Sequence, residues 1–281
     1  MKNKMKINTV AIILLFFSAQ VVLVAQKKPK IQGNKEVIQV SREILGTFNA
    51  VEIDDGLEVN LNAGTKNGFI MDLDSNLADI VQFFVVDSVL RVYTTHNITS
   101  KKKLDIYLNV TYLEHLMLKN DARVISKDPI RASRFYLVGY NSSQFELGIE
   151  ADDVTVTLHR NAGGKLDIIS ENTTIIMNDR TDLKANLETK NVRVTVNNSA
   201  DLKLDGEADY AAFNLKKSST LDARKMQVSS ADLYTSNSAD VYVNASKNLE
   251  VYAQGSSNVY VYGNPNVEIK GFTDKSKIIK R

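Results

Sequence analysis

Asn198-Ser199-Ala200-Asp201-Leu202 is one copy of a stretch that recurs, in variant form, through the C-terminal half of the chain. Each copy ends in an apolar residue that marks its place, and the markers are Val124, Phe145, Leu166, Leu183, Leu202, Leu221, Val241 and Val259. Their spacings run from 17 to 21 residues, with a mean of about 19. A period of this length, built from short alternating strands, indicates a β-solenoid in which each repeat forms one rung.

A tight corner precedes each marker. An asparagine stands four residues before several markers, and these are Asn120, Asn141, Asn198 and Asn237. Lys217 and Gly255 take this place in two other repeats, whereas Asn161 and Asn178 stand five residues before their markers. Asparagine tolerates left-handed backbone angles, and small neighbours such as Ala200 let corners stack at strand spacing, about 4.8 Å. The sequence therefore predicts one tight turn in every rung.

Two strands flank each corner. Residues six and eight positions before a marker and two positions after it are mostly apolar, as Val194, Val196 and Leu204 are around Leu202. This alternation turns one face of each strand inward, so that successive rungs share a continuous core. No window shows sustained helical spacing, and a helix is expected only in the N-terminal leader. The predicted fold class is all-β, a β-solenoid (β-helix) with rungs of about 19 residues.

The chain divides into five predicted segments. Residues 1–25 carry three lysines, then an apolar run and then Ala25, which is the order of a secretory signal peptide. A retained membrane anchor is the alternative, but Ser18 and Gln20 interrupt the apolar run. The other segments are a polar linker over 26–45, an N-terminal β section over 46–110, solenoid repeats over 111–270 and a basic tail over 271–281.

The charge and composition of the chain argue against nucleic acid and membrane surfaces as binding partners. The formal charge of the full chain is +2, and the predicted leader holds three lysines and no acid, so the remainder carries about −1. A near-neutral chain has no global field that would attract nucleic acid or a membrane surface. The chain has no cysteine, so a core rather than disulfides must hold the fold. We expect an exported protein, in the periplasm, at the cell surface or outside the cell, with no membrane span after the leader is removed.

Four motifs occur in order along residues 46–270. They are the opening Phe48-Asn49-Ala50-Val51-Glu52-Ile53-Asp54-Asp55-Gly56-Leu57-Glu58-Val59, then Tyr112-Leu113-Glu114-His115-Leu116, the repeated Ser-Ala-Asp-Leu/Val corner, and the closing Tyr262-Gly263-Asn264-Pro265. This order resembles the head GIN-domain family of auto-transporter adhesins, and the resemblance implies an exported β-solenoid of a Gram-negative envelope. The Gly-Ile-Asn that names the family is here Gly56-Leu57-Glu58, which keeps the turn but not the asparagine. The resemblance supplies no catalytic residue.

One column of carboxylates is a candidate for a metal site or a catalytic site. Asp182, Asp201 and Asp240 directly precede their markers, and Thr220 and Asn258 take the same place in two other rungs. Stacked carboxylates can bind calcium or act as acid and base on a sugar chain. Because Thr220 interrupts the column, we favour corner hydrogen bonding as its role.

The sequence predicts no catalytic, metal or cofactor site. The three histidines, His96, His115 and His159, lack metal-ligand spacing and have no cysteine beside them. There is no Gly-x-Ser-x-Gly motif to mark a nucleophile and no glycine-rich phosphate loop.

Tyrosines are the candidate ligand contacts. Tyr234 and Tyr252 stand seven residues before their markers, and Tyr242 and Tyr260 stand one residue after theirs. Each pair should stack on adjacent rungs with its rings outward, about 4.8 Å apart. Tyr262 should point the same way as Tyr260 and complete a flat aromatic patch that could contact a glycan or a protein. The alternative is that these tyrosines only support neighbouring strands.

The leading functional hypothesis is a non-enzymatic envelope protein that binds glycan or a surface protein through the solenoid face. A polysaccharide-active enzyme on a β-helix scaffold is one alternative, and it should show clustered carboxylates with Arg or Lys in one groove. A structural envelope spacer is the other, and it should show neither such a cluster nor an aromatic patch. The sequence carries no signal for an oligomeric state.

Overall fold

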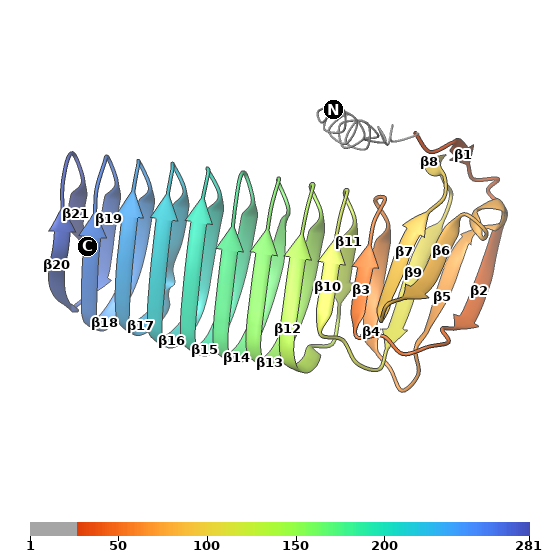
Figure 1. Ribbon diagram of the computed structural model, residues 1–281, viewed down its shortest axis with the longest axis horizontal. Coiled ribbons are helices and arrows are strands. Elements are labelled where there is room, and N and C mark those ends of the chain that lie inside the picture. The colour runs from red at the N-terminus through yellow and green to blue at the C-terminus, as the bar shows by residue number, and fades with distance from the viewer. Residues whose placement is uncertain (1–26) are drawn as a thin grey trace, which may run out of the picture.

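The computed structural model describes residues 27–281 as an elongated all-β body with one short 3₁₀ helix, η1 (Ser75–Leu77) (Figure 1). The predicted signal peptide, residues 1–25, lies outside the described residues. In the part of the chain that is described, no helix has the length and apolar character needed to cross a membrane. The predicted all-β solenoid is confirmed.

Each coil of the solenoid runs from one tight corner to the next. Complete coils are formed by β13 (Gln144–Leu158), β14 (Gly163–Met177), β15 (Asp182–Asn197), β16 (Asp201–Lys216), β17 (Thr220–Ser236) and β18 (Asp240–Ala253). Shorter strands form the coils at either end: β3 (Ala50–Ile53), β4 (Glu58–Ala63), β10 (His115–Leu118), β11 (Arg123–Ser126), β12 (Ile130–Gly139), β19 (Asn258–Gly263), β20 (Asn266–Phe272) and β21 (Lys277–Lys280). Neighbouring coils pair in parallel, so that Leu183, Leu202 and Leu221 stack in register.

The coils build two sheets that face each other across the core. We call the sheet made by residues before each tight corner the leading sheet, and the sheet made by residues after it the trailing sheet. Alternate side chains of both sheets point inward and are almost fully buried, as Val194, Val196 and Leu204 are. The same alternation leaves the other side chains outward, which fixes the side of the sheet on which each candidate residue lies.

The register differs from the predicted one at a single rung. Phe145 pairs with Gly164, and Gly164 pairs with Leu183, so Gly164 occupies the marker column. The predicted marker Leu166 is wrong; it aligns with Leu147 one inward position later. A search for apolar markers misses this place because a glycine fills it: a Cβ on Gly164 would lie 2.1 Å from the Phe145 carbonyl oxygen and 2.7 Å from Cδ2 of the Phe145 ring. The backbone and ring of Phe145 take the space that a side chain would need.

The tight corners follow one backbone rule. The residue four positions before the corrected marker has a positive φ at every coil, and these residues are Asp55, Asn120, Asn141, Arg160, Asp179, Asn198, Lys217, Asn237, Gly255 and Asp274. Arg160 and Asp179 hold this place in the two coils where the sequence pointed to Asn161 and Asn178. The marker error explains the difference at Arg160, whereas Leu183 is a correct marker and Asn178 stands one residue before the positive-φ position. In most coils the next residue also has a positive φ, which is the type I′ turn that matches the twist of the flanking strands.

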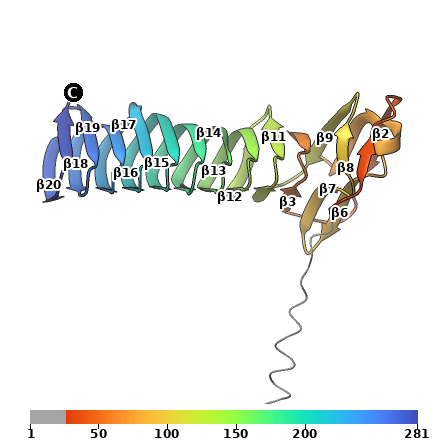
Figure 2. The ribbon, with the colours of Figure 1, turned by 90° about the horizontal axis from the view of Figure 1, so that it is seen from above.

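The solenoid extends into the predicted N-terminal β section. β3 and β4 form a coil that stacks against β10 and β11, with Val51 opposite Leu116 and Val59 opposite Val124. Beyond this coil the two sheets continue as a sandwich, whose strands are β2 (Val37–Glu43), β5 (Gly68–Asp74), β6 (Val81–Val86), β7 (Val89–Thr94) and β9 (Leu104–Val110). β9, β5 and β2 extend the trailing sheet, and β7 and β6 extend the leading sheet. Figure 2 shows these strands at one end of the rod.

The predicted linker and tail both contain strands. β1 (Lys30–Gln32) pairs with β8 (Asn97–Ser100), and β2 pairs with β5, so residues 26–45 are not a free linker. The buried Asp74 carboxylate accepts hydrogen bonds from the backbone N–H groups of Lys35, Lys102 and Lys103 at 3.0–3.2 Å. The bond from Lys35 holds the segment before β2 against the sandwich. At the other end β21 pairs with β19, so most of the basic tail forms part of the last coil.

Candidate functional site

The predicted tyrosines lie on two different faces. Tyr234 and Tyr252 belong to the leading sheet, and Tyr242, Tyr260 and Tyr262 belong to the trailing sheet. All five are half-buried and alternate with buried residues of the core. The two columns that the sequence distinguished therefore lie on opposite sheets of the solenoid.

Each tyrosine pair stacks as predicted. The ring centroids of Tyr234 and Tyr252 are 4.9 Å apart with 7° between the planes, and those of Tyr242 and Tyr260 are 4.6 Å apart with 8° between them. These distances confirm the expected strand spacing. The two rings of a pair stack face to face along the solenoid axis, so each ring presents its edge to the solvent. The prediction of a flat aromatic patch is therefore wrong, and a ligand meets ring edges and hydroxyls, or the outer face of an end ring.

In the trailing pair both outer ring faces are covered. The Arg224 guanidinium carbon lies 5.0 Å from the Tyr242 centroid, and that of Arg281 lies 5.6 Å from the Tyr260 centroid. Arg224 is held in place by Asp222, whose carboxylate accepts from Nε at 2.8 Å and from Nη2 at 2.6 Å. These hydrogen bonds lower the pKa of Asp222. We call Arg224, Tyr242, Tyr260 and Arg281 the trailing ladder; it is a closed stack with no ring face free for a ligand.

In the leading pair one outer face is closed by backbone and the other borders Asn214 and Lys216. A Cβ on Gly271 would lie 2.3 Å from Cε2 of Tyr252, so the Tyr252 ring rests on the Gly271 backbone. The outer side of Tyr234 faces Asn214, its register partner in the neighbouring coil, and Lys216 Nζ lies 5.5 Å from the Tyr234 centroid. Within residues 27–281 Lys216 forms no ion pair. An unclamped lysine has a flexible stem and can move aside, whereas the clamped Arg224 cannot do so as readily.

A groove is lined by Tyr234 and Asn214. This leading groove has a volume of about 360 Å³ and crosses several coils. Its outward-facing residues are Arg193, Thr195, Ala212, Asn214, Asp232, Tyr234, Glu250, Tyr252 and Lys270. The small Ala212 lies between the longer Arg193 and Asp232 in one column, which makes the hollow. Asn214 Oδ1 is buried and accepts no hydrogen bond from any residue in the described chain.

The charged walls of the leading groove are held by neighbours. The Tyr210 hydroxyl donates to Asp232 at 2.5 Å, and this hydrogen bond raises the pKa of Tyr210 to about 12. Lys270 lies 3.6 Å from the Glu250 carboxylate and 2.7 Å from the Glu268 carboxylate, and these contacts raise the pKa of Lys270. The groove therefore offers oriented acceptors and cations beside an aromatic face, the kind of mixture that fixes a polar ligand.

The carboxylate column and the histidines form no comparable site. Asp182 and Asp201 are neighbours, but Thr220 separates them from Asp240, whose carboxylate accepts from Asn258 Nδ2 at 2.8 Å. Among residues 27–281 no three His, Cys, Asp or Glu side chains lie close enough to share a metal ion.

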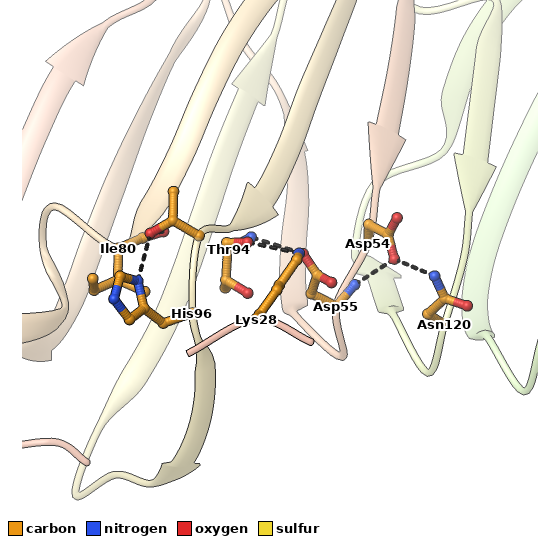
Figure 3. A network of polar contacts seen from close by, with 8 residues as sticks. Lys28, Asp54, Asp55, Ile80, Thr94, His96 and Asn120 are labelled. Carbon is orange, nitrogen blue, oxygen red and sulfur yellow. Dashed lines mark hydrogen bonds and ion pairs between the residues drawn. The ribbon is translucent and has the colours of Figure 1, made fainter. Parts of the chain in front are cut away.

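The histidines lie far apart and contact different partners. His115 stacks on Tyr136 at 4.7 Å, and His159 stacks on Tyr140 at 4.9 Å. His96 contacts the Thr95 hydroxyl at 3.0 Å near the N-terminal sandwich (Figure 3). None of these contacts places a histidine beside a nucleophile and a carboxylate.

The first corner is a structural anchor. Lys28 donates to the Asp55 carboxylate and, at 2.7 Å, to the Thr94 carbonyl, and Asn120 Nδ2 donates to Asp54 Oδ1 at 2.8 Å (Figure 3). A hollow of about 720 Å³ with several lysines lies beside it. Residues 1–26 lie outside the described part of the chain, and we assign no ligand to the hollow.

Most of the leading groove was not found from the sequence. The tyrosine pair was found because Tyr234 and Tyr252 share a column. Arg193, Asn214 and Asp232 were missed because each stands alone in its rung. The one usable signal was Ala212, a small outward residue in a column of long ones.

Known proteins share the architecture. A crystal structure described as a putative adhesin from Parabacteroides merdae matches with a TM-score of 0.65 and 17% identity, covering 90% of this chain and 99% of the other. A putative adhesin from Parabacteroides distasonis matches with a TM-score of 0.68 and 14% identity, covering 90% and 100%. A protein of the same organism described as a putative lipid binding protein matches with a TM-score of 0.59 and 16% identity, covering 89% and 96%. At these identities the likeness shows the fold.

The family assignment comes from sequence. No curated protein matches the chain. The model of the family described as "Putative auto-transporter adhesin, head GIN domain" matches twice, at residues 47–167 and 159–265. The two matches together span the first coil to the end of β19. The chain therefore belongs to the head GIN-domain family of auto-transporter adhesins.

Proposed function

We propose that the protein is a non-enzymatic glycan-binding protein of the cell envelope and that the leading groove holds the glycan. The family and the solved relatives described as adhesins support a role in surface attachment. The observation that carries the proposal is the hollow beside Tyr234, with the unpaired Asn214 Oδ1 at its wall. The glycan class that fits is a neutral polysaccharide, because cations and carboxylates alternate along the groove.

The groove chemistry matches sugar hydroxyls. A buried acceptor without a partner costs about 1–3 kcal/mol, and a hydroxyl that donates to Asn214 Oδ1 recovers this free energy. Asp232, oriented by Tyr210, accepts from a second hydroxyl. An apolar part of a sugar ring contacts the exposed edge of the Tyr234 ring, beside Asn214, once Lys216 moves aside. The residues come from successive coils, so the chain of sugars runs along the solenoid axis.

Binding is favoured over hydrolysis. Asp232 and Glu250 are neighbours across β17 and β18, which brings two carboxylates into the groove. A glycosidase needs one carboxyl group whose pKa is raised by burial, so that it can act as an acid. Asp232 is exposed and accepts from Tyr210, and Glu250 faces Lys270. Neither carboxylate is buried, so the groove lacks the desolvated carboxyl group that such an acid requires.

A glycan array tests the proposal. Residues 27–281 should bind a subset of neutral polysaccharides, and Ala212→Trp, which fills the hollow, should weaken that binding at least tenfold. The matched control is Thr155→Trp, because Thr155 lies in the same outward column two coils before Arg193, outside the groove. A blank array would favour the structural spacer. Equal binding by the Ala212→Trp variant would place the ligand elsewhere on the solenoid.

A further inference from the structure

The N-terminal sandwich ends in an apolar cleft between its two sheets. β2 is the last strand of the trailing sheet and β6 the last strand of the leading sheet, and both are seen at the end of the rod in Figure 2. The cleft has a volume of about 250 Å³. Its apolar lining consists of Val40, Ile44, Leu45, Phe69, Met71, Ala78, Val81, Phe83 and Val85. The cleft is thus an opening into the end of the core.

The inner end of the cleft is closed and its mouth is open. The Phe69 and Phe83 rings come from opposite sheets and stack with centroids 3.7 Å apart, which joins the sheets at the inner end. At the mouth Leu45 is 83% exposed, just after β2 ends. A leucine so exposed gains nothing from the fold, and its place beside an apolar opening suits contact with an apolar ligand.

One cation lies on the inward face of this otherwise apolar cleft. Arg42 pairs with Phe69, and Val40 pairs with Met71, so Arg42 and Val40 lie on the same face as the buried side chains of β5. Arg42 forms no ion pair within residues 27–281. The other charged groups at the cleft are Glu43, which lies 3.9 Å from Lys66, and Asp79, whose carbonyl accepts from Gln82.

We propose that this cleft binds the hydrocarbon chain of a single-chain amphiphile with an acidic head group, such as a fatty acid. The chain inserts between the sheets toward Phe69 and Phe83, and the carboxylate meets the Arg42 guanidinium at the mouth. Arginine is suited to this because its planar fork binds a carboxylate through two parallel hydrogen bonds. The volume lies just below the range of about 300–1,000 Å³ for drug-sized ligands, so one short chain or the end of a longer one fits.

This site is separate from the leading groove. The cleft lies in the N-terminal sandwich, whereas the groove lies on coils β15 to β20 near the other end of the rod (Figure 1). Failure of either proposal therefore leaves the other intact.

Displacement of a fluorescent fatty acid tests the proposal. The probe is 11-(dansylamino)undecanoic acid bound to residues 27–281, and the competitors are decanoate, decanol and decyltrimethylammonium. Decanoate should displace the probe at a concentration at least tenfold below the other two. The Arg42→Gln variant should lose this preference, so that decanoate and decanol compete equally. Arg131→Gln is the matched control, because Arg131 lies on the solenoid and pairs with Glu150.

A filled cleft provides the second test. Ala78→Leu, or Val40→Phe if the first variant does not fold, should reduce probe affinity at least fivefold without changing the preference for decanoate over decanol. Absence of probe binding by the wild-type protein would overturn the proposal. Equal competition by decanoate and decanol in the wild type, or unchanged binding by both cleft variants, would do the same. Tighter competition by decyltrimethylammonium would assign the mouth to Asp79 and Glu43 instead.

Discussion

The two tyrosine pairs share one geometry and differ in their neighbours. Both pairs stack at strand spacing with nearly parallel rings. The trailing pair is closed at both ends by Arg224 and Arg281, whereas the leading pair is closed at one end and borders a groove at the other. The repeat therefore determines that tyrosines stack, and the residues beside the stack determine whether a ring face is accessible. On the basis of this difference we propose that the trailing ladder contributes to stability and that the leading pair contributes to binding.

The largest effect is expected at the core that supports the leading pair. Phe213 is 2% exposed and lies directly behind the groove, between Ala212 and Asn214. Phe213→Ala should lower the free energy of unfolding by about 3–5 kcal/mol, because it leaves a cavity in a stacked column. Urea unfolding measures the change. A loss below about 1 kcal/mol would mean that the coils close around the gap and that the core is less tightly packed than the burial indicates.

Breaking the trailing ladder should cost stability and leave binding unchanged. Tyr242→Ser removes one ring contact worth about 0.2–1 kcal/mol and one cation–π contact worth about 0.5–1 kcal/mol. The variant should therefore unfold at a lower temperature than the wild type and bind the array glycan equally well. Tyr242→Phe is the control, because it keeps the ring and loses only the hydroxyl. Weaker glycan binding by Tyr242→Ser would contradict the proposal that the trailing pair contributes to stability and not to binding.

The trailing ladder should also weaken in acid. The Asp222 pKa is lowered in the folded protein, chiefly by the hydrogen bond from Arg224. A lowered folded-state pKa gives stability that is present above the ordinary value of 3.8 and is lost as the pH falls below it. Thermal melts between pH 6 and 3 should show this loss in the wild type and a smaller loss in Asp222→Asn. Parallel pH profiles of the two proteins would show that Asp222 does not clamp Arg224.

The smallest effect is expected at the carboxylate column, which lies at the start of the trailing sheet. Asp201→Asn should change the free energy of unfolding by less than about 0.5 kcal/mol, because the Asp201 side chain is exposed and forms no ion pair within residues 27–281. Thermal melts with and without calcium measure this. A calcium-dependent stabilisation of the wild type that is absent from Asp201→Asn would make the column a metal site and contradict its structural role.

The period predicted the fold, and the columns predicted the tyrosine stacks. Marker residues such as Leu202 revealed the coil because each inward column repeats along the chain. Gly164 interrupts the apolar marker column, since the space for a side chain at this position is filled by Phe145. The leading groove was not predictable in the same way, because Arg193, Asn214 and Asp232 come from different coils and repeat nothing. The strand register brings these side chains together, and the structure shows this register whereas the sequence pattern does not.

The Arg42 cleft was missed for a related reason. The alternation in β2 is weak, and the sequence there was read as a polar linker. Pairing of Arg42 with Phe69, 27 positions later in the chain, shows that the arginine faces inward. Long-range antiparallel pairing of this kind leaves no periodic signal in the sequence.

Isothermal titration of two double variants tests the central distinction most directly. The protein is titrated with the polysaccharide that binds best on the array, as the wild type, as Tyr234→Ser with Tyr252→Ser, and as Tyr242→Ser with Tyr260→Ser. We expect the leading-pair variant to bind at least tenfold more weakly, which is about 1.4 kcal/mol, and the trailing-pair variant to bind like the wild type. Equal affinity of all three proteins, or a loss confined to the trailing-pair variant, would contradict the account.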